Sequence, residues 1–137
     1  MDRRDLQQLS GVRLREAKAL LKIGLCDGAY YLAGYAVECA LKACISRRTR
    51  RYEFPDRKRV DASHSHNLRE LVKVAELEAS RLDRAGKDPD FRNNWDIAQS
   101  WSEQSRYQKH RPESAKALLD AVSDRQHGVI AWIKLHW

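Results

Sequence analysis

The apolar residues of this chain recur with the spacing of α-helices rather than of strands. The first such stretch has one apolar face, whose members lie three to four positions apart: Leu14, Ala17, Leu20 and Leu21. Gly24 is expected to end this helix, and Asp27 to cap a second one that extends to Ser46. Because so short a connection makes consecutive helices antiparallel neighbours, the first 46 residues predict a helical hairpin.

The middle of the chain predicts a connector and then a third helix. Residues 47–64 are expected to form an ordered loop, since Pro55 disfavours helical geometry in the residue before it. Asn67 followed by Glu70 resembles a capping box, so a helix should begin there and close at Gly86 or after a short continuation.

Two strong helix starts follow. At residues 88–90 the sequence is Asp-Pro-Asp. The first aspartate can cap a helix, the proline suits the first helical position, and the second aspartate places a favourable negative charge in the first turn. Pro112 opens the last helix, which is expected to run to the C-terminus with a bend at Gly128. The whole pattern predicts an all-α, up-and-down bundle of four to five helices, forming one domain over residues 1–137.

The cysteines and the distribution of apolar residues indicate the cellular compartment. The three cysteines are an odd number, and Cys39 and Cys44 would point apart on one helix, so no disulfide framework is expected. The chain begins without an apolar signal region and contains no apolar run long enough to cross a bilayer. These features predict a cytoplasmic protein without membrane association.

The formal net charge of +7 favours nucleic acid, nucleotides or acidic proteins as partners. Seven basic residues fall in the expected connector: Arg47, Arg48, Arg50, Arg51, Arg57, Lys58 and Arg59. With Tyr52 and Phe54 among them, they could hold a phosphate backbone while a ring stacks on a base. The alternative is a solvated connector without a ligand.

Several classes of site are absent from the sequence. It has no glycine-rich phosphate loop, no Ser-His-Asp arrangement and no paired-carboxylate motif. His64 and His66 lack a matching cysteine or carboxylate pattern, so neither a metal nor a cofactor is expected. Glu38 and Lys42 have the i,i+4 spacing of a local ion pair, and His66 is interpreted as a helix-start residue that fixes the connector.

A resemblance to a known family rests on three segments. Residues 27–45, with small residues, an internal Glu38 and a Leu-Lys-Ala ending, resemble the second helix of HEPN (higher eukaryotes and prokaryotes nucleotide-binding) domains. The His-Asn-Leu sequence at 66–68 is similar to the family's His-Asp-Leu, and Arg106-Tyr107 stands ahead of the last helix. The resemblance covers about residues 11–135.

This resemblance implies a helical bundle that forms a two-fold homodimer, and members that bind nucleotides or RNA or act as ribonucleases. The ribonuclease motif is an Arg, four to six intervening residues and a His. Arg106 and His110 occupy the corresponding place with only three intervening residues, and Arg59 to His64 fits the spacing inside the basic connector. If one helix covers Arg106 and His110 they share a face; otherwise they are a surface pair, and Tyr107 either stacks on a base or packs in the core.

Two hypotheses follow from these residues. In the first, a dimeric HEPN protein binds a nucleotide or RNA, or a nucleotidyltransferase-type partner, in a toxin-antitoxin or defence setting. In the second, the protein is a metal-independent endoribonuclease, in which His110 moves a proton of the RNA 2′-hydroxyl and Arg106 stabilises charge on phosphorus.

Overall fold

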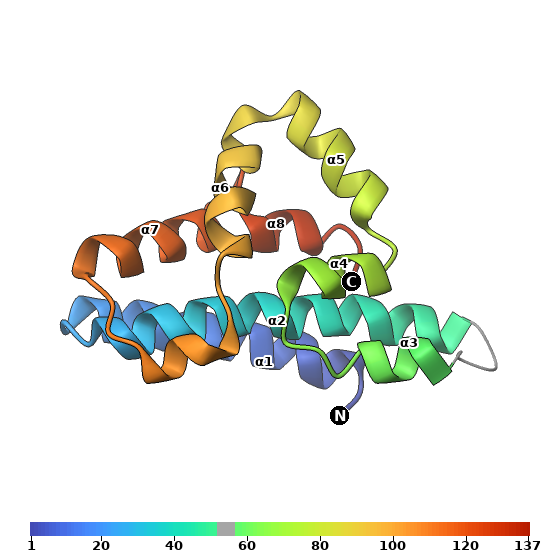
Figure 1. Cartoon of the computed structure of the whole chain (residues 1–137), viewed down its shortest axis with the longest axis horizontal. Helices are drawn as coiled ribbons and strands as arrows, with labels where there is room; N and C mark the ends of the chain where they lie inside the picture. The colour runs from blue at the N-terminus through green and yellow to red at the C-terminus, as the bar shows by residue number, and fades with distance from the viewer. Residues whose placement is uncertain (52–56) are drawn as a thin grey trace.

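The computed structural model describes the backbone of residues 1–51 and 57–137 and the side chains of residues 1–49, 57 and 60–137. Over these residues the chain forms eight α-helices and one short 3₁₀ helix, without a strand (Figure 1). The prediction of an all-α fold is therefore confirmed. None of the described helices combines the length and apolarity needed to cross a bilayer.

Two long helices, α1 (Arg3–Lys22) and α2 (Cys26–Arg51), form the base of the molecule and run side by side along its longest axis (Figure 1). The turn between them uses Gly24 at φ 84°, a left-handed conformation that glycine adopts at little cost. Asp27 is not the cap predicted for α2, because the helix already begins at Cys26. The Asp27 carboxylate instead accepts a hydrogen bond from a distant segment, described below.

The prediction of a loop over residues 47–64 is wrong at both ends. α2 continues past Ser46 to Arg51, and α3 (Arg57–Ala62) follows, while residues 52–56 lie outside the described residues. The extension of α2 is supported by Arg47, whose guanidinium donates to the backbone carbonyl of His136 at 3.1 Å.

The expected third helix is divided into α4 (Leu68–Val74) and α5 (Glu78–Lys87). Between them Glu76 has φ 58°, and the Leu77 N–H bonds to the Val72 carbonyl at 2.9 Å, which is the pattern of a helix ending in a left-handed residue. No glycine marks this helix end, and Gly86, where the third helix was expected to close, lies inside α5.

Asn67 caps α4, but the capping box predicted with Glu70 is only half formed. The Asn67 side chain accepts the Glu70 N–H at 3.1 Å. The Glu70 carboxylate does not return to Asn67; it accepts the Ser65 hydroxyl at 2.6 Å, and the Ser65 oxygen accepts the Asn67 N–H.

The C-terminal half confirms both predicted helix starts. Asp88 caps α6 (Pro89–Gln99) through the Phe91 N–H, and Pro112 opens α7 (Pro112–Ser123). Between these helices lies the 3₁₀ helix η1 (Glu103–Tyr107).

The last predicted helix is broken rather than bent. α7 ends at Ser123, and α8 (Val129–Ile133) begins after Gly128. The Asp124 carboxylate accepts the backbone N–H groups of Gln126 and His127 at 3.0 and 2.7 Å, which holds the turn between the two helices.

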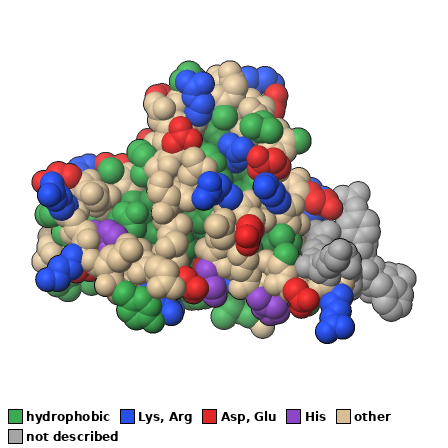
Figure 2. All heavy atoms as spheres, viewed as in Figure 1, with side chains coloured by type: hydrophobic (Ala, Val, Ile, Leu, Met, Phe, Trp, Pro, Cys, Tyr) green, Lys and Arg blue, Asp and Glu red, His purple; other side chains and the backbone are tan. Residues whose placement is uncertain are grey.

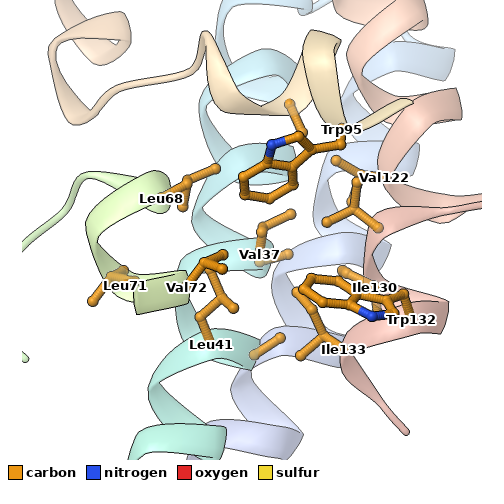
Figure 3. Packing of buried hydrophobic residues seen from close by; sticks show 14 of the residues in the cluster. Val37, Leu41, Leu68, Leu71, Val72, Trp95, Val122, Ile130, Trp132 and Ile133 are labelled. Carbon is orange, nitrogen blue, oxygen red and sulfur yellow. The ribbon is translucent and has the colours of Figure 1, made fainter. Parts of the chain in front are cut away.

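The core lies where α4, α6, α7 and α8 meet the inner face of α2 (Figure 3). Trp95 of α6 and Trp132 of α8 are almost fully buried and meet edge to face, with ring centroids 6.4 Å apart. α5 and α6 rise as an arch over the hairpin, and η1 follows α6 back down to the hairpin (Figure 1). The arrangement places η1 against the first half of α2.

Candidate nucleic-acid site

The segment that carries Arg106 is anchored on α2 by Trp101. The Trp101 side chain is 3% exposed and its ring lies 5.9 Å from the ring of Tyr31. A Cβ at Gly34 would lie 2.2 Å from the Trp101 ring, so this close approach requires glycine. η1 begins two residues after Trp101 and is thereby fixed to α2.

Arg106 and Tyr107 form an exposed pair at the end of η1. Tyr107 is 73% exposed, and the Arg106 guanidinium carbon lies 4.8 Å from the centre of its ring. Hydrogen bonding to Tyr107, and secondarily to Tyr31, raises the pKa of Arg106, which stays a cation. The alternative that Tyr107 packs in the core is wrong, because its ring faces solvent.

His110 lies on the neighbouring tyrosine of α2. Its ring stacks on Tyr30 with centroids 3.8 Å apart, and its Nε2 bonds to the Ser105 carbonyl at 3.1 Å. The His110 backbone N–H donates to the Asp27 carboxylate at 2.6 Å. A pocket of about 370 Å³ borders this histidine, with Leu25 and Asp27 among its walls.

Arg106 and His110 do not share a helical face, as one continuous helix would have required. η1 ends at Tyr107, and Gln108 and Arg111 are extended, with ψ of 156° and 152°. No hydrogen bond joins the Arg106 and His110 side chains within the described part of the chain. The His110 ring nevertheless rests on Tyr30 of α2, and the segment that carries Arg106 is held beside the next residue of that helix, since the Trp101 ring lies 5.9 Å from the Tyr31 ring.

Glu38, Lys42 and His66 lie together beside this segment. The Glu38 side chain is 3% exposed; its Oε2 lies 3.2 Å from Lys42 Nζ and its Oε1 lies 3.0 Å from His66 Nδ1. His66 Nε2 in turn lies 3.3 Å from the Glu103 carboxylate in η1. The sequence paired Glu38 with Lys42 only; the structure adds His66 and Glu103, which tie η1 and the start of α4 to the buried carboxylate.

The basic residues of the expected connector are not brought to Arg106. Arg47 and Arg48 lie at the far end of α2, about 24 Å along the helix axis from Tyr31 at 1.5 Å per residue. Arg48 pairs with Glu76. The side chains of Arg50, Arg51, Lys58 and Arg59 lie outside the described residues, as does any contact of the Arg59 to His64 motif.

On the face seen in Figure 2 the described cationic side chains are spread out rather than gathered. Figure 2 shows Lys and Arg side chains over the whole of the face in view, mixed with Asp and Glu. A ligand on this face would therefore be selected by local groups such as the Arg106–Tyr107 pair more than by one broad positive field.

A cluster that the sequence did not indicate joins the start of α6 to the turn before α8. Asp88, Asp90 and His127 bring three ligand-type atoms within 4.8 Å, the one such group among the residues described. Asp88 Oδ2 already lies 2.8 Å from His127 Nδ1 and 3.2 Å from Arg84 Nε. This carboxylate oxygen faces two N–H donors, as it would in a charge-assisted ion pair. We therefore interpret the cluster as a structural ion pair rather than a metal site.

Sequence reasoning missed the supports of the candidate site, namely Asp27, Tyr30, Tyr31 and Ser105. The adjacent tyrosines at the start of α2 were the available signal, because a helix with two neighbouring large aromatic rings needs something to cover both. Their partners, about 75 residues later, were not visible in any local pattern.

Comparison with known proteins identifies the family. Residues 8–134 match the HEPN domain, which is nearly the whole chain. The protein therefore belongs to the HEPN domain family. No significant match was found among curated proteins or among solved structures.

Proposed function

We propose that this HEPN protein binds a nucleotide or RNA through Arg106 and Tyr107, as a homodimer. The observation that carries the proposal is the exposed Tyr107 ring with the Arg106 guanidinium against it. Such a pair offers a base a surface for stacking and offers the adjoining phosphate a counter-charge. The net charge of +7 supports an anionic ligand.

The test is binding of labelled, single-stranded RNA of mixed sequence, measured by fluorescence anisotropy. Removing a ring that stacks on one base costs about 1–3 kcal/mol, so Tyr107→Ala should weaken binding by about tenfold or more. Arg106→Ala should weaken binding and reduce the slope of affinity against salt. Lys116→Ala, which removes an exposed cation on α7, is the matched control and should change the affinity little. Equal affinities of all four proteins would contradict the proposal.

The homodimer rests on exposed apolar residues at the turn of the hairpin. Ile23 and Leu25 are 69% and 55% exposed, so two large apolar side chains face solvent at this turn. Sedimentation equilibrium of the wild type and of Ile23→Glu tests this part, because a charge at the interface should shift the population towards the monomer.

A second candidate function is that of a metal-independent endoribonuclease. It is favoured by the hydrogen bond that His110 makes, which decides which ring nitrogen carries the proton. Because the Ser105 carbonyl can only accept, His110 Nε2 carries a proton, and in the neutral ring Nδ1 is the basic nitrogen. No partner of Nδ1 is found among the described residues. Such a nitrogen can accept the proton of an RNA 2′-hydroxyl, while Arg106 stabilises the charge on phosphorus.

Incubation of the protein with labelled RNA in chelator separates the two candidates. Cleavage by the wild type that both His110→Ala and Arg106→Ala abolish would establish the ribonuclease. RNA that is bound but stays intact would support the binding module and exclude the enzyme.

A toxin-antitoxin or defence role and a nucleotidyltransferase-type partner stay predictions from the family resemblance. Production of this chain alone tests the first, since a free RNA-cutting toxin slows the growth of its host and a binding subunit does not. Co-production with a candidate partner, followed by gel filtration, tests the second.

A further inference from the structure

A cavity of about 480 Å³ lies between α1 and the C-terminal segment of the chain, and no residue of η1 lines it. Seven residues of α1 form one wall, and three residues near the C-terminus form the other: Gln7, Gln8, Ser10, Gly11, Val12, Leu14 and Arg15, with Ile130, Lys134 and Trp137. Its apolar side chains are those of Val12, Leu14, Ile130 and Trp137. The volume falls in the range of pockets that hold small organic molecules.

Gly11 forms part of the cavity wall, and nothing in the fold requires a glycine there. It lies in the middle of α1, where only proline is less favourable to the helix. Its backbone is not left-handed, and a Cβ at this position would meet only the Arg15 guanidinium, at 3.8 Å. Gly34 is different, because a Cβ there would collide with Trp101. The missing side chain of Gly11 leaves the cavity open.

The charges around the cavity have one sign. Arg15 and Lys134 are its two charged side chains, and none of the ten residues that line it is acidic. The Lys134 ammonium lies 5.6 Å from the centre of the Trp137 ring, so a cation and an aromatic ring lie together at the wall. Apolar walls with two cations complement a ligand that has an apolar ring and an acidic group.

We propose that this cavity binds a small, flat aromatic anion, with its ring against Leu14 and Trp137 and its acidic group between Arg15 and Lys134. The site is separate from the Arg106–Tyr107 pair and does not depend on RNA binding. Glutamine side chains at positions 7 and 8 add hydrogen-bonding groups to the same wall.

The first test compares two fluorescent probes that share the same rings, 8-anilinonaphthalene-1-sulfonate and the uncharged N-phenyl-1-naphthylamine. The sulfonate should bind the folded wild type about tenfold more tightly, because only it pairs with the cations. Lys134→Glu should remove this preference. Lys116→Glu makes the same change of charge on α7, outside the cavity, and should retain it.

Filling the cavity is the second test. Gly11→Leu has room for its Cβ and favours the helix, so the variant should fold and lose sulfonate binding. Gly86→Leu places the same side chain in open space on α5 and should bind as the wild type does. Near-UV circular dichroism confirms that each variant is folded.

Sulfonate binding that survives Gly11→Leu, or that is lost equally in Gly86→Leu, would overturn the proposal. A Gly11→Leu variant that binds the probe normally but changes its sedimentation would also overturn it and identify this face as an interface between copies. RNA binding by Gly11→Leu should equal that of the wild type, so failure here is distinct from failure at Arg106.

Discussion

The imidazole of His110 lies flat against the phenol ring of Tyr30, with the ring planes 10° from parallel. The same residue donates its backbone N–H to Asp27 in the first turn of α2. His110 therefore connects the segment between η1 and α7 to the start of α2. Its ring is held in place by this stacking and by the hydrogen bond of its Nε2 to the Ser105 carbonyl.

His110→Ala should lower the free energy of unfolding by about 1–2 kcal/mol, because it removes the stacking on Tyr30 and the hydrogen bond to the Ser105 carbonyl. Urea denaturation measures the change. His64→Ala, in an exposed histidine, is the control and should stay within about 0.5 kcal/mol of the wild type. Equal effects of the two substitutions would show that the stacking contributes no stability.

Gly34→Ala should lower the stability of the protein far more than an added methyl group usually does. The new Cβ would lie 2.2 Å from the Trp101 ring, so α2 and the segment before η1 must move apart, at a cost of about 1–3 kcal/mol or more. Gly86→Ala adds the same group in open space within a helix and should stabilise the protein by about 0.5–1 kcal/mol. Thermal unfolding of both variants checks the opposite signs.

The His127–Asp88 pair predicts a pH window of greatest stabilisation. The hydrogen bond to His127 lowers the pKa of Asp88 to about 2, and the same bond raises the pKa of His127 above its ordinary 6.5. The Asp88 contribution is present above its ordinary pKa of 3.8 and is lost as pH falls towards 2. The His127 contribution is present below pH 6.5 and is lost as pH rises through its raised pKa.

His127→Asn should therefore destabilise the protein most between pH 3.8 and 6.5, and the difference from the wild type should shrink in alkaline solution. Urea denaturation at about pH 5 and about pH 9 measures both limits. A difference that does not vary with pH would contradict the ion pair.

Glu38→Ala should lower the free energy of unfolding by about 2–4 kcal/mol, because it leaves Lys42 and His66 without their shared buried carboxylate. Glu38→Gln keeps one acceptor and the side-chain volume, and should lose less. Chemical denaturation of the two variants makes the comparison. If Glu38→Ala lost less free energy of unfolding than Glu38→Gln, the buried carboxylate would be destabilising rather than stabilising.

The sequence predicted those parts of the fold that depend on neighbours along the chain. The hairpin, the cap at Asp88 and the helix start at Pro112 follow from local spacing and from turn chemistry. The end of α4 does not, because Glu76 adopts a conformation for which the expected signal is glycine. The break before α8 depends on Asp124, whose carboxylate binds backbone groups that no periodic pattern marks.

The candidate site was only partly predictable for a related reason. The order of residues in the sequence indicates Arg106, Tyr107 and His110, but the position of His110 depends on Tyr30, and that of the segment before η1 depends on the contact of Trp101 with Tyr31. These contacts exist only in the folded chain. The sequence leaves open whether one helix covers both Arg106 and His110. In the structure it does not, because Trp101 packs where Gly34 has no side chain and holds η1 on α2, and η1 ends before α7 begins.

α2 also packs against residues that the ribosome makes much later than α2 itself. Cys44 donates its thiol to the Ile133 carbonyl at 3.8 Å, across 89 residues of chain. At about 5–20 residues per second, a ribosome needs on the order of 4–18 seconds to deliver the second partner after the first. During that interval the apolar face of α2 that the C-terminal helices cover in the folded protein has no partner, so it is exposed to water while the chain is being made.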